Sequence, residues 1–323
     1  MTLPVFADFD TGVDDAVALV YLLASPDAEL VGIACTGGNV AVHQVCCNNL
    51  AVLQLCGAPG IPVSKGADAP LDGPAHTAET IHGPQGLGYA ELPPGTGRLT
   101  GYDAAAAWVA AARAHPGQLV GLATGPLTNL ALALRAEPAL PTLLRRLVIM
   151  GGAFSGERSG WAEFNIGFDP VAAAEVFAAW GTAAPQRLPI VCGLDLTRHI
   201  AITPAILGLL PEPSGHPVVR LLDDALRFYF EAHVARGHGY LAYLHDPLAA
   251  AIALEPDLVS TRPAAVHIEL APTAARGRTI PDWDARRPNA LIGVGVDPAA
   301  FFDRFVQRVG ALADRLGGVP PHS

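Results

Sequence analysis

Apolar and polar positions follow two patterns along the chain. Short apolar runs alternate with longer segments in which apolar residues recur every three or four positions, as on buried strands and the helices that cover them. The apolar runs predict strands at residues 3–7, 29–36, 119–123, 147–150, 188–192, 265–270 and 290–296. The longer spacing predicts helices at residues 16–23, 104–114, 169–179, 218–234, 247–253 and 297–316, with another ending near residue 55. Such alternation predicts an α/β fold built on a parallel sheet.

Several predicted strands end in glycine and small polar residues, at positions 37–39, 124–129 and 151–152. In a parallel sheet these ends share one edge, where open α/β folds bind their ligands. We therefore expect an open, mostly parallel, Rossmann-like sheet flanked by helices, with the active site at the C-terminal ends of the strands.

No linker or repeat interrupts the 323 residues, so we expect a single α/β domain spanning residues 1–323. Residues 66–97 are rich in Gly, Pro, His and Thr. A loop of that length in a compact domain is usually functional or mobile, which predicts a flap over about 66–97. A helical region at about 218–245, broken by Gly-His-Gly at 237–239, is expected to resemble a lid.

Four carboxylates surround one glycine at the end of the first predicted strand: Asp8, Asp10, Asp14 and Asp15 around Gly12. We expect a tight turn here, with Gly12 supplying its backbone angles. Asp14 and Asp15 would lie in the first helical turn, where the helix dipole favours negative charge. That effect offsets only part of the mutual repulsion, and carboxylates this close raise one another's pKa or share a cation. Ligands that are all oxygen suit calcium or magnesium.

Three alternatives compete with a cation site. An acidic, solvated N-cap needs one or two acids rather than four. A calcium loop of the EF-hand type needs an acidic twelfth residue, and counting from Asp8 gives Leu19. A haloacid-dehalogenase-like phosphatase also has Asp-x-Asp after its first strand, but Gly12 stands where that family has Thr or Val. A cation site at the carboxyl end of the first strand fits better.

Five polar residues in later segments are candidates for the same site: Asn39, His82, Glu163, Asn165 and Asp246. Each has an ordinary structural alternative. Asn39 is equally suited to cap a helix, and a surface position is the default for His82. In an extended segment Glu163 and Asn165 would share one side, as they would on a solvent-facing edge. The His-Asp-Pro sequence that starts a predicted helix would put Asp246 at its N-cap.

Composition excludes several classes of partner. The net charge of −10 argues against nucleic-acid binding. No apolar run is long enough to span a membrane. The five cysteines are odd in number and show no C-x-x-C spacing, so we expect no zinc site and a reducing, cytoplasmic location.

Six motifs occur in a characteristic order: Asp-x-Asp-x-Gly-x-Asp-Asp at 8–15, Gly-Asn at 38–39, Thr-Gly-Pro-Leu-Thr-Asn at 124–129, Met-Gly-Gly at 150–152, Ala-Glu-Phe-Asn-Ile at 162–166 and His-Asp-Pro at 245–247. In this order the chain resembles, over nearly its whole length, the inosine–uridine-preferring nucleoside hydrolase family. The aspartate cluster and the His-Asp-Pro sequence are the most specific parts of the resemblance. It implies hydrolysis of the N-glycosidic bond of ribonucleosides to free base and ribose.

The resemblance also implies a calcium ion, held by the side chains of Asp10, Asp15 and Asp246 and by the backbone carbonyl of Thr124. It implies metal-bound water as the nucleophile, with Asp10 as its general base. His245 matches a histidine that donates a proton to the leaving purine in some members. These roles agree with the reaction, because an oxocarbenium-like sugar develops positive charge that buried carboxylates stabilise.

Further residues match the family's substrate site. Asp14, Asn39 and Asn165 match residues that bind the ribose hydroxyls, and Glu163 matches a carboxylate near the 5′ and 3′ hydroxyls. His82, in the flap, matches a histidine near the base. Family members form dimers and tetramers, so the resemblance also implies a homo-oligomer, acting in nucleoside metabolism and salvage.

We therefore expect a calcium-dependent ribonucleoside N-ribohydrolase whose partner is a small-molecule nucleoside. A calcium-dependent ribose- or nucleoside-binding protein without turnover is the alternative from another class, and a metal-dependent phosphatase is the third. The sequence leaves the choice between purine and pyrimidine bases open.

The chain departs from the family pattern at three places. Thr11 stands where Pro is common, a mild change. Glu157 and Arg158 follow Gly156 where the family commonly has Asn, which leaves recognition of the 5′ hydroxyl open. The Gly-His-Gly sequence at 237–239 replaces an Arg of some members, which leaves base preference open.

Overall fold

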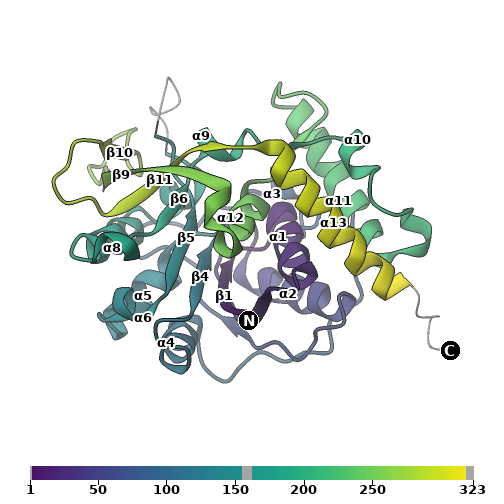
Figure 1. Ribbon diagram of the computed structural model, residues 1–323, viewed down its shortest axis with the longest axis horizontal. Helices are drawn as coiled ribbons and strands as arrows, with labels where there is room; N and C mark the ends of the chain where they lie inside the picture. Colours follow the sequence, from purple (N-terminus) through teal and green to yellow (C-terminus); the bar gives the residue numbers. More distant parts are fainter. Residues whose placement is uncertain (1, 155–161, 318–323) are drawn as a thin grey trace.

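The computed structural model describes residues 2–154 and 162–317. In these residues nine strands form one sheet in the order β10-β9-β11-β6-β5-β4-β1-β2-β3. All neighbours from β3 to β11 run parallel, whereas β9 pairs antiparallel with both β11 and β10. The open, mostly parallel sheet expected from the sequence is confirmed, and helices cover both of its faces (Figure 1).

The strands of the large sheet are β1 (Leu3–Phe9), β2 (Ala28–Cys35), β3 (Val63–Lys65), β4 (Val120–Ala123), β5 (Arg146–Met150), β6 (Ile190–Cys192), β9 (Val259–Ile268), β10 (Thr279–Asp282) and β11 (Ala290–Val296). A separate antiparallel pair joins β7 (Ala201–Ile202) and β8 (Ala242–Tyr243). The α-helices are α1 (Val13–Ala24), α2 (Val42–Leu55), α3 (Glu79–His82), α4 (Ala104–Ala114), α5 (Thr128–Ala136), α6 (Leu140–Leu143), α7 (Phe164–Phe168), α8 (Pro170–Trp180), α9 (Leu194–Thr197), α10 (Pro204–Leu207), α11 (Pro217–Val234), α12 (His245–Leu254) and α13 (Pro298–Gly317).

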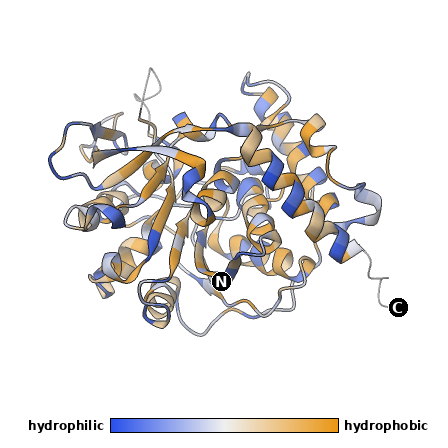
Figure 2. Cartoon of the chain, in the orientation of Figure 1, coloured by the Kyte–Doolittle hydropathy of each residue, from blue (hydrophilic) through white to orange (hydrophobic). Residues whose placement is uncertain are grey.

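Two hydrophobic cores lie on opposite faces of the sheet. Helices α1, α2, α11, α12 and α13 contribute to one core, and α4, α5, α6 and α8 contribute to the other. Successive strand residues alternate between them, as Val5 and Ala7 do against Phe6. Because both faces are covered, the central strands are almost continuously hydrophobic (Figure 2).

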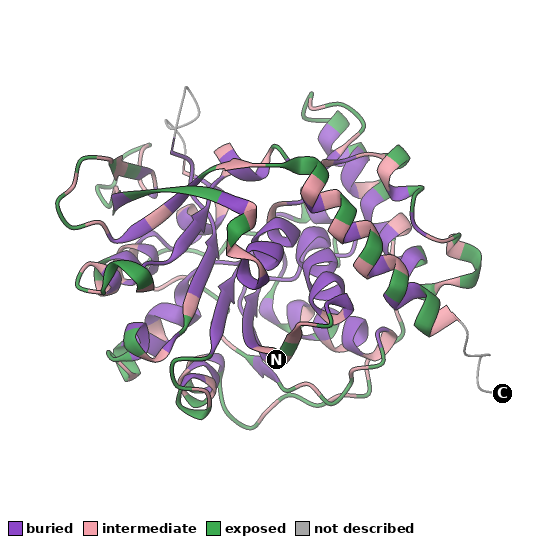
Figure 3. Ribbon diagram, viewed as in Figure 1, coloured by how far each residue is buried: buried purple, intermediate pink, exposed green. Residues whose placement is uncertain are grey.

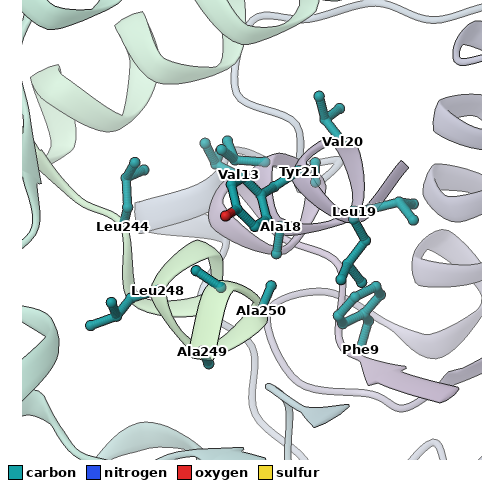
Figure 4. Close-up of a cluster of buried hydrophobic side chains, with 14 of the residues drawn as sticks. Phe9, Val13, Ala18, Leu19, Val20, Tyr21, Leu244, Leu248, Ala249 and Ala250 are labelled. Carbon is teal, nitrogen blue, oxygen red and sulfur yellow. The ribbon is translucent and has the colours of Figure 1, made fainter. Parts of the chain in front are cut away.

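Helices α1 and α12 pack against each other at the centre of the first core (Figure 4). Both are buried along almost their whole length (Figure 3). Small side chains such as Ala18, Ala249 and Ala250 allow close packing, while Val13 and Leu248 supply buried apolar volume. Since α1 follows the aspartate cluster and α12 contains Asp246, this packing brings two distant acidic segments together.

The sheet edge differs from the prediction. Strand β9 begins at Val259 rather than at 265. The sequence did not predict its first half, because residues 260–263 are exposed and do not alternate with buried ones, although they pair with β11. Strands β3 and β10 were not predicted and are short. The five cysteines are free. No described helix is long and apolar enough to cross a membrane.

Candidate active site

The turn between β1 and α1 is organised by close packing around Gly12. Gly12 has φ −93° and ψ −161°, so the predicted need for special backbone angles is wrong. A Cβ on Gly12 would instead strike His82 Nδ1 and Asn39 Nδ2. The Gly12 N–H donates to Asp15 Oδ2 at 2.9 Å, which fixes that carboxylate on the first turn of α1. Glycine is required here by space, because side chains from two later segments lie against the turn.

The four N-terminal carboxylates are buried, with exposed fractions of 2% for Asp8, 1% for Asp10, 4% for Asp14 and 0% for Asp15. The solvated N-cap alternative is therefore wrong. Burial raises the pKa of all four, to about 6 for Asp8 and about 8 for Asp14. The charge of Asp15 is the next cause of the raised pKa at Asp10 and Asp14. Such a cluster requires protons or a cation to offset its charge.

Three of the buried carboxylates lie close together. Asp14, Asp15 and Asp246 each place an oxygen within 4.8 Å of the other two. Asp10 adjoins this group, since Asp15 and Asp14 both raise its pKa. Among the described residues, Asp10 Oδ1 and Asp14 Oδ1 are buried and have no hydrogen-bond partner. Unpartnered carboxylate oxygens in a buried acidic group are the donors that a hard divalent cation takes, so these residues fit a metal ion.

Asp246 enters the acidic group from the first turn of α12. The helix begins at His245 and its N-cap is Leu244, so the prediction of Asp246 as N-cap is wrong. Pro247 still stands within the first turn, where its missing N–H leaves no helical bond unmade. His245 Nδ1 lies 2.6 Å from Thr197 Oγ1 at the end of α9. One helical turn thus supplies both an acid and a histidine to the site.

Asp8 has a different environment from the other three carboxylates. Its Oδ2 accepts a hydrogen bond from Trp108 Nε1 at 2.7 Å, and its Oδ1 accepts one from Asn129 Nδ2 at 2.9 Å. Asp10 Oδ2 instead accepts from the backbone N–H of Asn39 at 2.9 Å. Asp8 therefore ties β1 to α4 and α5, whereas Asp10 belongs to the acidic site.

Two neutral residues from neighbouring strand ends contact Asp15. Asn39 lies before α2, whose N-cap is Ala41, and its Nδ2 donates to Asp15 Oδ2 at 3.2 Å. Of the two alternatives for Asn39, the capping role is therefore wrong. Thr124 Oγ1 donates to Asp15 Oδ1 at 2.7 Å, and the Thr124 carbonyl accepts from Asn165 Nδ2 at 2.5 Å. The ends of β2 and β4 thus converge on one carboxylate.

The segment around Glu163 is a helix start, not the extended segment that its alternation predicted. Glu163 is the N-cap of α7, and its carboxylate accepts from the backbone N–H groups of Asn165, Ile166 and Gly152 at 3.0 to 3.1 Å. At 6% exposed, it does not form a solvent-facing edge. The free N–H groups of a first helical turn attract an acceptor strongly enough to override the weak alternation. The loop at 156–159 and Trp161 lie outside the described residues.

These residues surround one pocket of about 220 Å³. Its acidic part is lined by Asp14, Asn39, Thr124, Glu163, Asn165 and Asp246, and its aromatic part by histidines and tyrosines that include His82, Tyr229, His233, Tyr243 and His245. The two parts meet where His82 Nδ1 lies 3.7 Å from Asp14 Oδ1. Asp10 and Asp15 lie behind Asn39 and Thr124 rather than on the pocket surface. We call these two parts the acidic end and the aromatic end.

The aromatic end is a chain of rings. Ring centroids lie 5.3 Å apart for His82 and Tyr229, 4.6 Å for Tyr229 and His233, and 5.3 Å for His233 and Tyr243. Tyr243 lies 5.8 Å from His245. His82 is only 6% exposed, so the surface position taken as its default is wrong. Burial lowers the pKa of His82 and of His245 to about 3.

Sequence reasoning missed several residues of the aromatic end as site candidates. Tyr229 and His233 are four residues apart on the buried face of α11, and Arg198 and Arg236 also line the pocket. Tyr229 OH donates to Asp14 Oδ2 at 3.5 Å and so joins the two ends. The sequence feature that could have identified them is a histidine and a tyrosine one turn apart on an otherwise apolar helix face.

Comparison with known proteins identifies the class. Residues 5–303 match the family model described as inosine-uridine preferring nucleoside hydrolase. The pyrimidine-specific ribonucleoside hydrolases RihA of Salmonella paratyphi B and Klebsiella pneumoniae are 35% identical over 315 and 319 residues, covering 96% and 97% of this chain and 99% and 100% of the relative. A purine-preferring ribonucleoside hydrolase from Gardnerella vaginalis superposes with a TM-score of 0.89 at 33% identity, covering 97% of this chain and 99% of its own.

With an α/β fold whose buried carboxylate site lies at the strand ends, these likenesses define a ribonucleoside hydrolase, an enzyme that hydrolyses the N-glycosyl bond of nucleosides. The chain belongs to the inosine-uridine preferring nucleoside hydrolase family, and the resemblance drawn from its motifs is confirmed. One group of relatives is named for pyrimidines and one solved structure for purines, so the names leave base preference open.

Proposed function

We propose that the enzyme is a calcium-dependent ribonucleoside N-ribohydrolase that binds the cation and ribose at the acidic end and the base at the aromatic end. The observation that supports this most is the buried group of Asp14, Asp15 and Asp246 with its unpartnered oxygen. Cleavage of the N-glycosyl bond builds positive charge on the ribose. Fixed negative charge in a buried site lowers the energy of that state.

The side chains of Asp10, Asp15 and Asp246 and the backbone carbonyl of Thr124 would hold the cation. Calcium accepts roughly six to eight oxygen ligands in flexible geometry, which carboxylates, a carbonyl and sugar hydroxyls supply together. The Thr124 carbonyl already accepts from Asn165, and a carbonyl oxygen has a second lone pair for an ion. When bound, the ion would add positive charge and acidify a nearby water molecule.

Asp10 would be the general base that takes the proton from the attacking water. Its Oδ2 is held by the Asn39 N–H, which leaves the unpartnered Oδ1 to accept a proton. Asp14, Asn39 and Asn165 would bind the ribose hydroxyls, with Glu163 near the 5′ side. All four of these residues line the pocket, as such contacts require.

The base would lie between the rings of the aromatic end, near His82 and His245. His245 would supply a proton to the departing base from the Nε2–H of its neutral ring, because burial lowers the pKa of His245 to about 3. The Thr197 hydroxyl beside His245 Nδ1 engages that nitrogen, which leaves Nε2 as the atom available to substrate.

Within a single domain spanning residues 1–323, the segment at about 66–97 would act as a flap and the region at about 218–245 as a lid. Two contacts between them support this division. Tyr89 OH donates to Glu231 Oε2 at 2.6 Å, and Arg236 Nη2 donates to Thr80 Oγ1 at 3.0 Å. His82 ends the flap's short helix α3 and reaches the pocket from there.

Metal removal tests the proposal. Protein stripped with a chelator, and verified metal-free by elemental analysis, should lose about a hundredfold or more of its base-release activity. Calcium should restore it, and the melting temperature should rise with calcium, because a ligand that binds only the folded state stabilises it. Full activity in verified metal-free protein would contradict the proposal, and restoration by magnesium but not calcium would reassign the ion.

A further inference from the structure

Two histidines at the aromatic end have protonation sites that the backbone fixes. His82 Nδ1 accepts a hydrogen bond from the Val13 backbone N–H at 3.1 Å. A backbone N–H can only donate, so His82 Nδ1 has no proton, and the neutral ring must carry its proton on Nε2. His82 therefore offers a hydrogen-bond donor at Nε2.

His233 has the opposite arrangement. Its Nδ1 lies 2.8 Å from the backbone carbonyl of Tyr229, one helical turn earlier. A carbonyl can only accept, so Nδ1 carries the proton and Nε2 of the neutral ring has a lone pair. Burial lowers the pKa of His233, which keeps the ring neutral near pH 7. His233 therefore offers a hydrogen-bond acceptor at Nε2.

Both Nε2 atoms are available to a ligand. His82 and His233 line the pocket, and each is 6% exposed. Among the described residues, neither Nε2 atom has a hydrogen-bond partner. Both atoms nevertheless remain accessible, because neither is among the fully buried polar atoms that lack a partner. In side chains so largely buried, a polar atom that stays accessible and unpartnered is suited to a substrate group.

The surroundings suit a flat heterocycle. The rings of Tyr229 and Tyr243 lie 4.6 Å and 5.3 Å from that of His233, with edge-on packing that fixes the imidazole plane. His238, half-buried on the following loop, lies 5.9 Å away. The orientation of the His233 acceptor is therefore set by packing as well as by the Nδ1 hydrogen bond.

We propose that His233 is a specificity-determining residue that selects the base through Nε2, by accepting a hydrogen bond from an N–H group on the base. The inference rests on the proposed function and deepens it. An N–H group can occur on one-ring and two-ring bases alike, so this contact selects by edge chemistry rather than by ring size. A base whose N–H is replaced leaves the His233 lone pair buried and unpaired.

The experiment compares uridine with 3-methyluridine, in which a methyl group replaces the single N–H of the base. We expect wild-type kcat/KM to fall about tenfold or more on methylation, because a buried acceptor loses its partner. In His233→Ala the acceptor is gone and space opens for the methyl group, so the penalty should shrink to about threefold or less. His238→Ala is the matched control, a pocket histidine whose loss should leave the full penalty.

Inosine and 1-methylinosine repeat the test for a two-ring base. If the alanine variant fails to fold, His233→Val replaces it, because valine also lacks the acceptor and is smaller than histidine. An equal methylation penalty in wild type and in the His233 variant overturns the inference, as does the absence of a penalty in wild type. If the wild-type enzyme releases base from none of the four nucleosides (uridine, inosine and their methylated forms), the proposed function is overturned instead.

Discussion

The two ends of the pocket are built in different ways. At the acidic end, Asp10 and Asp15 are almost fully buried, and backbone N–H groups of Asn39 and Gly12 hold their carboxylates. The aromatic end takes its rings from the flap, from α11, from β8 and from the first turn of α12, and α11 exposes its outer face to solvent (Figure 3). The comparison indicates that backbone N–H groups hold the carboxylates of the acidic end, whereas the aromatic end depends on packing between rings that come from several elements.

The largest effect should follow a change at the acidic end. Asp10→Asn removes the proposed base while keeping the acceptor for the Asn39 N–H, so the turn should persist. Loss of a general base typically costs about a hundredfold or more in kcat. Steady-state kinetics with saturating calcium would measure this, and near-wild-type turnover would show that the role assigned to Asp10 is wrong.

Asp8→Asn is the matched control, because it makes the same chemical change two residues earlier on β1. Asp8 accepts from both Trp108 and Asn129, and an amide can accept only through its oxygen. We expect a loss of about 1–3 kcal/mol in the free energy of unfolding, with turnover per folded molecule nearly unchanged. Denaturant unfolding measures the first quantity and kcat the second.

The same contrast explains what the sequence could predict. The acidic end was predictable because most of its acids lie within eight residues, and because parallel strands bring their carboxyl ends to one edge. The long helices were predictable from their apolar spacing, as α13 shows with Phe301, Phe305 and Val309 buried on one face. Both features are local patterns.

The aromatic end was less predictable because its geometry depends on tertiary contacts. His233 and Tyr229 lie within an amphipathic helix, and its apolar spacing predicts a core role as readily as a pocket role. The burial of His82 depends on the fit of a loop against Gly12, which no local pattern encodes. The start of α7 depends on Glu163 as its N-cap, and a few hydrogen bonds decide whether this segment is helical or extended.

The loss of activity caused by a substitution at the aromatic end should depend on the leaving group, whereas the loss caused by one at the acidic end should not. His245→Ala should lower kcat/KM for inosine by roughly tenfold to a hundredfold, within the range of proton-transfer catalysis. The loss on an activated p-nitrophenyl riboside should be much smaller, because that leaving group needs no proton. Equal losses on both substrates would indicate that His245 acts by placing Asp246.

Gly12→Ala should disturb both ends at once, because a residue of each end lies against Gly12. The added methyl group would strike His82 from the flap and Asn39 from the end of β2, with no backbone strain at φ −93°. Overpacking of this kind costs about 1–3 kcal/mol of folding stability. We expect the displacement of His82 and Asn39 to lower kcat/KM by roughly tenfold, which is about 1.4 kcal/mol of transition-state stabilisation. Ala16→Gly, in the buried helix α1 that follows the turn, adds no atoms and controls for loss of fold. Unchanged kinetics in Gly12→Ala would show that the flap is not held against the turn.

The smallest effect should come from the 5′ hydroxyl of the substrate, at the margin of the acidic end. Glu163 is the described carboxylate assigned to that side, yet it already accepts three backbone N–H groups as the cap of α7. Its remaining capacity for a sugar hydroxyl is therefore small, and Glu157 and Arg158 stand where the family commonly has an asparagine. A well-formed hydroxyl site is worth about 1–3 kcal/mol, so a poorly formed one should fall below the tenfold that 1.4 kcal/mol represents.

We therefore expect a 5′-deoxynucleoside to lose less than about tenfold in kcat/KM relative to its parent, since each tenfold requires 1.4 kcal/mol. Glu157→Asn would restore an amide that can both donate to the hydroxyl and accept from it, and should deepen the loss. Arg158→Asn places the same amide one position later and serves as the control. A loss of several hundredfold in the wild-type enzyme would mean that another group binds the 5′ hydroxyl firmly. The acidic end would then extend to the 5′ side of the sugar, beyond Glu163.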